Sequence, residues 1–188
     1  MKKVTLLGDS IRLNYENRVI ELLGDDYSVF RFDDNCRFAQ YTLRALFEYD
    51  QFIRGSDVIH WNAGHWDLCD LFGDGPFTPE EQYVATIKRI GGLLLKITPN
   101  VIFATTTPVR PENIYNSDKT IRRFNELAVG ALSPMGIKIN DLYATVSKDI
   151  GANICDDLIH LTPAGIELCA AQVADAIKKS VDNPAEKV

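Results

Sequence analysis

Residues 4–11 read Val-Thr-Leu-Leu-Gly-Asp-Ser-Ile, a short β-rich run that leads directly into a turn. Val4 to Leu7 lacks the clean polar alternation of a half-exposed strand, so it predicts a strand buried on both faces of a sheet. Gly8 allows a tight turn after that strand, and Ser10 follows close to the start of the next helix. The segment therefore predicts a strand, a turn and a helix in immediate succession.

The same succession recurs along the chain. Further short apolar runs occupy residues 27–32, 57–61, 101–105 and 137–139. The segments between them and after them place apolar side chains on one helical stripe, over residues 38–53, 84–94, 121–131 and 166–177. Alternating strands and helices predict a parallel sheet of about five strands with right-handed crossovers, covered by helices on both faces. The predicted fold class is three-layer αβα, and ligands are expected beyond the carboxyl ends of the strands.

Two threonine-proline pairs predict helix starts. Thr78 is expected to be the N-cap of one helix with Pro79 at its first position, and Thr162-Pro163 is expected to open the last helix in the same way. Gly55 and Gly136 stand where helices are expected to stop.

The composition indicates one globular domain over residues 1–188. Of the 188 residues, 46% are hydrophobic and 24% are charged, which is enough apolar material for a sizeable core. The formal charge of -6 argues against a nucleic-acid partner, because such surfaces are usually basic. The sequence has no run of roughly 18 apolar residues, so no membrane-spanning helix is expected. No pattern in the sequence specifies an oligomeric state. The polar segment 182–188, which contains Pro184, is expected to fray.

The cysteines and the amino-terminal lysines bear on location. Lys2 and Lys3 imitate the charged start of a signal peptide, but the apolar run that follows is too short, so an unprocessed protein is expected. The cysteines are widely spaced and are expected to be reduced thiols of a cytoplasmic protein; they are Cys36, Cys69, Cys155 and Cys169. Three histidines without paired ligand spacing predict no metal site.

Two motifs are expected at the carboxyl edge of the sheet. Ser10 can expose its hydroxyl there and aim its N–H at a developing negative charge; alternatively, Asp9 or Ser10 only caps the helix. Near the other end of the chain, Asp157 stands three residues before His160. A histidine can take the proton of a serine nucleophile, and a carboxylate can orient the ring. The alternative is a capping Asp beside a surface His.

These two motifs resemble the first and last sequence blocks of the SGNH superfamily of GDSL-type esterases and acylhydrolases. Gly8-Asp9-Ser10-Ile11 is similar to the first block, and Asp157-x-x-His160 is similar to the last. The resemblance covers nearly the whole chain. It implies a flavodoxin-like sheet and ester hydrolysis by Ser10, His160 and Asp157 without a metal or other cofactor.

The middle blocks depart from the family pattern. The family usually has a glycine after the second strand, whose N–H joins the oxyanion hole; here the loop reads Asp-Asn-Cys-Arg-Phe over 34–38. We expect a backbone N–H of Cys36 or Arg37 to serve instead. The third block, normally Gly-x-Asn-Asp, reads Gly-His-Trp-Asp over 64–67. Trp66 replaces the asparagine, so Asn62, at the end of the third strand, is the expected substitute donor beside the Ser10 N–H.

Asn35, His65 and Trp66 are expected to line the substrate pocket, although Trp66 can equally be a lid over the core. His60, within the third strand, is expected to be a packed core residue.

The leading hypothesis is a serine esterase for small-acyl esters, with O-acetylated carbohydrates as the first candidate substrate. The alternatives are a lipid or thioester acylhydrolase, and a non-catalytic ligand-binding relative of the family. A flavin-binding protein is disfavoured because the first loop lacks a Ser/Thr/Gly-rich phosphate cradle.

Overall fold

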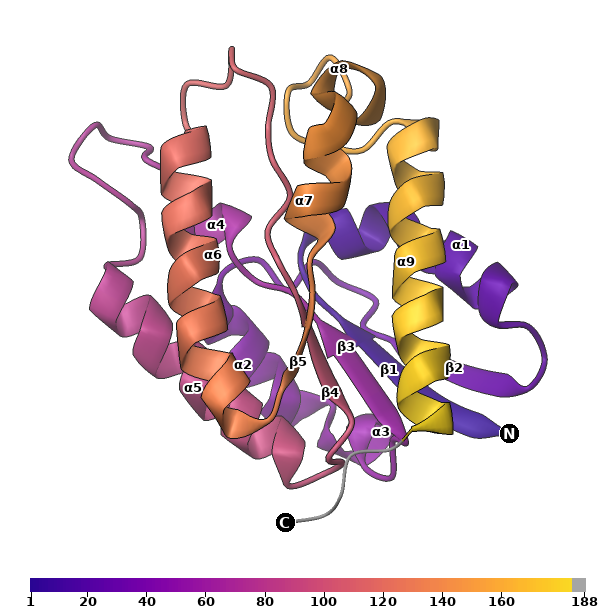
Figure 1. Cartoon of the computed structure of the whole chain (residues 1–188). Coiled ribbons are helices and arrows are strands. Elements are labelled where there is room, and N and C mark those ends of the chain that lie inside the picture. Colours follow the sequence, from indigo (N-terminus) through magenta and orange to yellow (C-terminus); the bar gives the residue numbers. More distant parts are fainter. Residues whose placement is uncertain (184–188) are drawn as a thin grey trace.

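The computed structural model describes residues 1–183 and contains a sheet of five parallel strands (Figure 1). In spatial order the strands are β2 (Tyr27–Arg31), β1 (Lys2–Leu7), β3 (Val58–Trp61), β4 (Val101–Ala104) and β5 (Lys138–Asn140). All neighbouring pairs are parallel. The 2-1-3-4-5 order is the flavodoxin-like order that the resemblance implies. The predicted strands are confirmed, with ends that differ by one or two residues.

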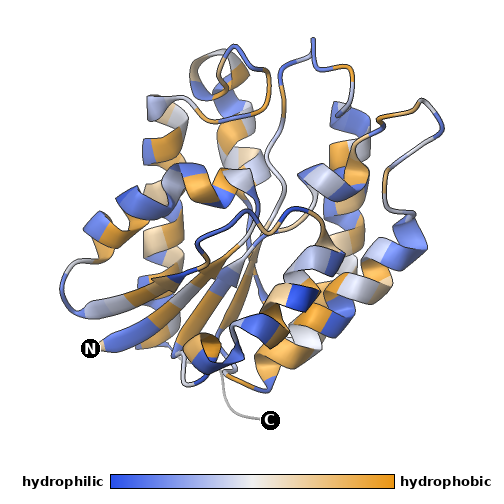
Figure 2. Ribbon diagram, turned by 180° about the vertical axis from the view of Figure 1, so that it is seen from behind, coloured by the Kyte–Doolittle hydropathy of each residue, from blue (hydrophilic) through white to orange (hydrophobic). Residues whose placement is uncertain are grey.

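The central strands are buried because both faces of the sheet are covered. Successive side chains point to opposite faces: Leu7 and Phe103 belong to one hydrophobic cluster, whereas Leu6 and Ile102 belong to the other. β3 and β4 are buried along their whole length. Figure 2 shows these hydrophobic strands between two helical layers whose outer surfaces are more polar.

The helical layers confirm the predicted fold class. One face packs against α2 (Ala39–Glu48), α5 (Glu80–Leu95) and α6 (Asp118–Leu132). The other face packs against α1 (Ser10–Leu23) and α9 (Pro163–Asp182). Short helices occupy the connections; they are α3 (Asp50–Ile53), α4 (His65–Leu68), η1 (Ser133–Met135), α7 (Leu142–Val146), η2 (Ser147–Asp149) and α8 (Ile150–Asn153).

The two threonine-proline pairs behave differently. Thr162 caps α9 as expected, since its hydroxyl accepts a hydrogen bond from the Gly165 N–H at 3.1 Å and Pro163 is the first helical residue. The prediction for Thr78 is wrong by one residue. Pro79 has an extended ψ of 143°, so α5 begins at Glu80 without a side-chain cap.

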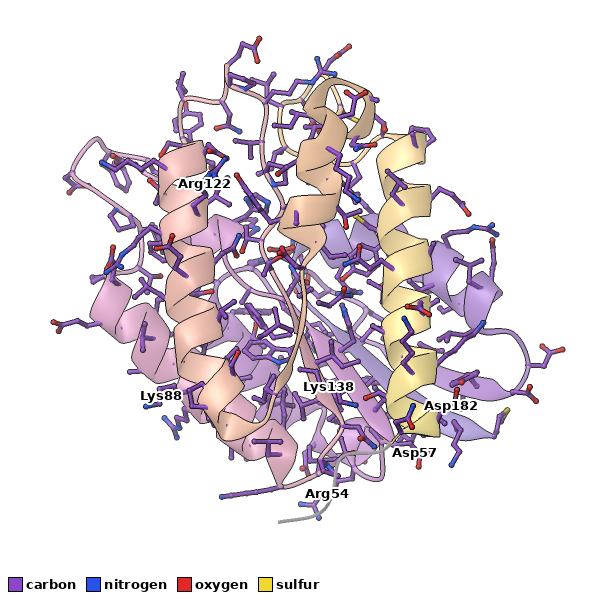
Figure 3. All side chains as sticks on the ribbon, in the orientation of Figure 1. Arg54, Asp57, Lys88, Arg122, Lys138 and Asp182 are labelled. Carbon is purple, nitrogen blue, oxygen red and sulfur yellow. The ribbon has the colours of Figure 1, made fainter. Side chains whose placement is uncertain are left out.

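The chain end is ordered further than the sequence suggested. Asp182 is the last residue of α9. Lys138 of β5 donates to Ser180 Oγ at 2.9 Å and to Asn183 O at 3.3 Å. Of the tail expected to fray, residues 184–188 lie outside the described residues. Figure 3 shows Asp182 and Asp57 at the same end of the molecule, the edge where β3 begins.

Within residues 1–183, no helix combines the length and the apolar character that crossing a membrane requires.

Candidate active site

The turn after β1 holds the candidate nucleophile. Ser10 is the first residue of α1 and is half-buried. Asp9 precedes it as the N-cap, because its Oδ1 accepts a hydrogen bond from the Ile11 N–H at 3.0 Å. The capping role of Asp9 is therefore confirmed, and it leaves the Ser10 side chain outside the cap. As the first helical residue, Ser10 has no acceptor for its own N–H within the helix, so this N–H can bind a negatively charged oxygen.

Asn62 lies directly after β3 and against this turn. Its side chain is buried, with 4% of the residue exposed, and its Nδ2 donates to Asp9 Oδ1 at 2.7 Å. The absence of a Cβ on Gly8 makes room for it, since a Cβ built there would lie 1.8 Å from Asn62 Oδ1. The Asn62 amide is thus fixed beside the residue that precedes Ser10. The bond to Asp9 uses one of its two N–H groups and leaves the second for another acceptor.

A hairpin between α8 and α9 holds the candidate base. An antiparallel bridge between Ile154 and Leu161 closes it. Asp157 Oδ1 accepts the backbone N–H groups of Ile159 at 3.1 Å and His160 at 3.0 Å. Asp157 Oδ2 lies 2.7 Å from His160 Nδ1. The Asp-x-x-His spacing therefore places one carboxylate so that it holds both the backbone and the ring of the histidine.

This geometry indicates which ring nitrogen of His160 faces the carboxylate with a proton. A carboxylate accepts hydrogen bonds, so Nδ1 of His160 carries the proton and Nε2 of the neutral ring keeps a lone pair. Desolvation raises the pKa of Asp157, but the hydrogen bonds from the His160 and Ile159 N–H groups and from the His160 ring outweigh it and hold that pKa below its usual range. The carboxylate is half exposed, so solvent screens its charge.

The hairpin is attached to the helix that carries Ser10. The Leu161 N–H donates to Asn14 Oδ1 at 3.0 Å, and Asn14 stands four residues after Ser10 on α1. Arg110 also binds the hairpin. Its backbone N–H donates to Leu158 O at 3.0 Å, and its side-chain Nε donates to Ile154 O at 2.9 Å. Sequence reasoning gave Asn14 no role, although its i+4 spacing from Ser10 places it on the same helix face.

In the loop after β2, the two backbone N–H groups predicted as oxyanion donors are already hydrogen-bonded, which contradicts that prediction. The Cys36 N–H donates to Gly8 O at 3.0 Å, and the Arg37 N–H donates to Asn35 Oδ1 at 2.8 Å. Both backbone donors already have acceptors, so neither is free for a substrate oxygen in this arrangement. Arg37 has a φ of 46°, in the left-handed region that favours glycine. Asn35 is half-buried, and its Nδ2 has no partner among residues 1–183.

His65 joins the site from α4. It is buried, and its Nδ1 lies 3.3 Å from Asn116 Nδ2 while its Nε2 lies 3.1 Å from Thr107 Oγ1. Because the amide nitrogen is a donor, Nδ1 accepts and Nε2–H donates to the threonine. Burial lowers the pKa of His65 to about 4, with Asp9 opposing the shift and His160 adding to it. The ring is therefore neutral and within electrostatic range of both motifs.

The other expected residues divide between core and surface. His60 is fully buried in β3, as predicted, and burial lowers its pKa to about 3. Trp66 is 42% exposed. Asp67, for which no role was expected, is buried and accepts the Ala39 N–H at the start of α2 at 2.9 Å. Among the described residues, no group of three His, Cys, Asp or Glu side chains could hold a metal ion.

Comparison with known proteins agrees with the resemblance. No protein-family model matches the chain. It is 25% identical over 166 residues to a GDSL esterase/lipase of rice, Oryza sativa subsp. japonica; the match covers 80% of this chain and 64% of that relative, so the chain spans less than two thirds of its length.

Solved structures share the fold. A lipase/acylhydrolase from Enterococcus faecalis superposes with a TM-score of 0.79 and 18% identity, over 99% of this chain and 100% of the other. Axe2, an acetylxylan esterase from Geobacillus stearothermophilus, superposes with a TM-score of 0.71 and 14% identity, over 100% and 96% of the two chains.

Gly8 provides a test of the packing around Ser10. Gly8→Ala should lower the free energy of unfolding by about 2–5 kcal/mol, because the new methyl group collides with the Asn62 amide and the residue has a φ of 154°. Urea denaturation measures this loss. Gly130→Ala is the matched control: a Cβ there meets nothing within 4 Å, and alanine favours the helix, so a change under about 1 kcal/mol is expected. Equal stability of the two variants would refute the close approach of Asn62.

Proposed function

We propose that this chain, which belongs to the SGNH superfamily of GDSL-type hydrolases, is a serine esterase that acts through Ser10, His160 and Asp157. The observation that carries the proposal is the attachment of the His160 hairpin to α1. The Leu161 N–H donates a hydrogen bond to Asn14 on α1, the helix that begins at Ser10. This bond connects the hairpin that holds the base to the helix that holds the nucleophile. The Asp157–His160 hydrogen bond of 2.7 Å supports the same assignment.

In the proposed reaction, Ser10 Oγ attacks the ester carbonyl carbon while His160 Nε2 takes the hydroxyl proton. Asp157 holds the ring by Nδ1 and stabilises the imidazolium. The tetrahedral intermediate then collapses, the ester C–O bond breaks, and His160 returns the proton to the leaving alcohol. Water repeats the sequence on the acyl-enzyme, releasing the acid and Ser10.

The oxyanion requires donors placed where negative charge develops. We assign this role to the Ser10 N–H, at the start of α1, and to the Nδ2 group of Asn62. The bond from Asn62 to Asp9 supports the assignment, because it fixes the amide beside the nucleophile. Asn35, in the loop after β2, is assigned to substrate binding together with the exposed Trp66. His65 is buried and both of its ring nitrogens are bonded, so it is assigned to the wall of the pocket rather than to a hydrogen bond with the substrate.

We propose a small-acyl ester as substrate, with O-acetylated carbohydrates as the first candidate. The acetylxylan esterase of Geobacillus stearothermophilus, which shares the fold, supports this choice. A cytoplasmic location belongs to the same proposal, since all four cysteines are free thiols in the structure.

An apolar acyl group is the second candidate. Large apolar side chains are exposed around α4, on the loop before α5 and on the loop before α6; they are Trp66, Leu71, Phe72, Phe77, Ile114 and Tyr115. The two loops are in contact, because the Asp70 N–H donates to Tyr115 O at 2.8 Å. Such a surface favours a longer acyl chain or an apolar alcohol.

The nucleophile is tested by covalent labelling. A fluorophosphonate should label the wild-type protein at Ser10, and Ser10→Ala should abolish both labelling and ester hydrolysis while the thermal unfolding temperature stays unchanged. Peptide mapping of the labelled protein identifies the residue. Full activity in Ser10→Ala would exclude this site, and an inert wild-type protein would favour the non-catalytic alternative.

The Asp157 carboxylate has a separate signature in the pH profile. Wild-type activity should rise with pH, because the general base must be free of a proton before it can accept the one on Ser10. Asp157 stays ionised over this rise, since its pKa lies below its usual range. Asp157→Asn should lower kcat by less than about 10⁴-fold, the loss expected for a buried triad Asp. It should also change the pH profile, since a negative charge beside the ring is removed. An unchanged kcat and profile would assign the orienting role elsewhere.

Asn62 is tested against Asn35. Asn62→Ala should lower kcat by about 10²–10³-fold with little change in KM, since the lost donor acts on the transition state. Asn35→Ala should raise KM and leave kcat nearly constant. Steady-state kinetics of both variants, with urea denaturation to verify folding, separates the two roles. A larger kcat loss in Asn35→Ala would transfer the oxyanion role to Asn35.

Acyl preference separates the two substrate candidates. Hydrolysis of p-nitrophenyl esters from acetyl to decanoyl, with acetylated xylan alongside, should show the highest kcat/KM for acetyl and release acetate from the polysaccharide. A preference that rises with chain length would favour the apolar surface as the acyl site.

A further inference from the structure

Arg12 is a buried charge that the proposed reaction does not use. It stands two residues after Ser10 in the first turn of α1, and none of the residue is exposed. A guanidinium stays charged in proteins and almost never lies fully buried without partners. Its contacts therefore indicate what it is there to hold.

Most of its partners are backbone carbonyls from two different loops. Nη1 donates to Phe32 O at 2.9 Å, and Nη2 donates to Asp34 O at 2.7 Å and to Gly8 O at 3.3 Å. Nη1 also contacts the carboxylate of Glu16, one turn further along α1. One planar group thus spans the turn before the nucleophile and the loop after β2.

Gly8 O is the point where the two loops join. It accepts the Cys36 N–H at 3.0 Å as well as Arg12 Nη2. Residues 32–38 contain no glycine, and Arg37 still adopts a left-handed backbone with a φ of 46°. A residue other than glycine is strained in a left-handed backbone, so contacts with the rest of the protein must hold this loop in place. The Arg12 bonds to Phe32 and Asp34 are the charged part of that support.

Glu16 keeps the guanidinium partnered. Glu16 is 6% exposed, and its second oxygen accepts Arg31 Nη1 at 3.0 Å. The carboxylate therefore balances two cations at the end of β2, and Arg12 is not an orphaned buried charge.

We infer that Arg12 is a positioning residue that fixes the loop 32–38, and with it Asn35, relative to the Ser10 turn. The inference rests on the proposed esterase function. Its loss should weaken substrate binding through Asn35. It should also slow the chemical step, because Arg12 holds Gly8 O in the turn before Ser10 and a displacement of about 1 Å at a catalytic site can cost about 10²-fold in rate. Lysine cannot replace it, since one ammonium group cannot bridge carbonyls of both loops as the planar fork does.

The test compares Arg12→Lys and Arg12→Gln with Arg18→Lys. Arg18 is a half-exposed arginine on the same helix and pairs with Glu167. Both Arg12 variants should lower kcat about 10- to 10²-fold and raise KM as Asn35→Ala does, and amide hydrogen exchange should rise in residues 32–38. Arg18→Lys should match the wild type in all three measurements.

The outcomes separate the inference from the function. Wild-type kcat and KM in Arg12→Lys, or unchanged hydrogen exchange in residues 32–38, overturn the inference while Ser10-dependent hydrolysis still stands. Unfolding of both Arg12 variants also overturns it, since Arg12 would then be required for folding. Activity that survives Ser10→Ala in the wild-type background instead overturns the proposed function.

Discussion

One carboxylate oxygen, Asp9 Oδ1, connects the main parts of the site. It caps α1 through the Ile11 N–H at 3.0 Å and accepts the Asn62 amide at 2.7 Å. The first bond determines where the helix begins. Ser10 is therefore its first residue, and the N–H of Ser10 has no acceptor within the helix. The second bond brings the end of β3 against the end of β1. Gly8 allows this approach because it has no Cβ to collide with Asn62.

The same turn also organises the surrounding loops. Gly8 O accepts both the Cys36 N–H and the Arg12 guanidinium, so the loop after β2 is attached to it on one side. Asn14, on the next turn of α1, attaches the His160 hairpin on the other side. Three segments distant in sequence thus meet at the carboxyl edge of the sheet, where α/β proteins of this order bind their ligands.

The sequence predicted the elements whose signals are local or periodic. Buried strands and amphipathic helices have characteristic spacing, and the alternation of the two types implies a parallel sheet. The Asp157–His160 pair was also predictable, because three residues separate its members. The Cys36 and Arg37 assignments failed for a different reason. Whether a backbone N–H is free depends on acceptors elsewhere, here Gly8 O and Asn35 Oδ1. The role inferred for Arg12 depends on a loop some twenty residues away, which no spacing rule predicts.

The proposed reaction requires that Ser10 be acylated. Brief incubation with p-nitrophenyl acetate, acid quenching and peptide mass spectrometry measure which residue carries the acyl group. The wild-type protein should carry an acetyl group on the peptide that contains Ser10, and Ser10→Ala should show neither that adduct nor turnover. An acetyl group on another residue, or undiminished hydrolysis by Ser10→Ala, would contradict it.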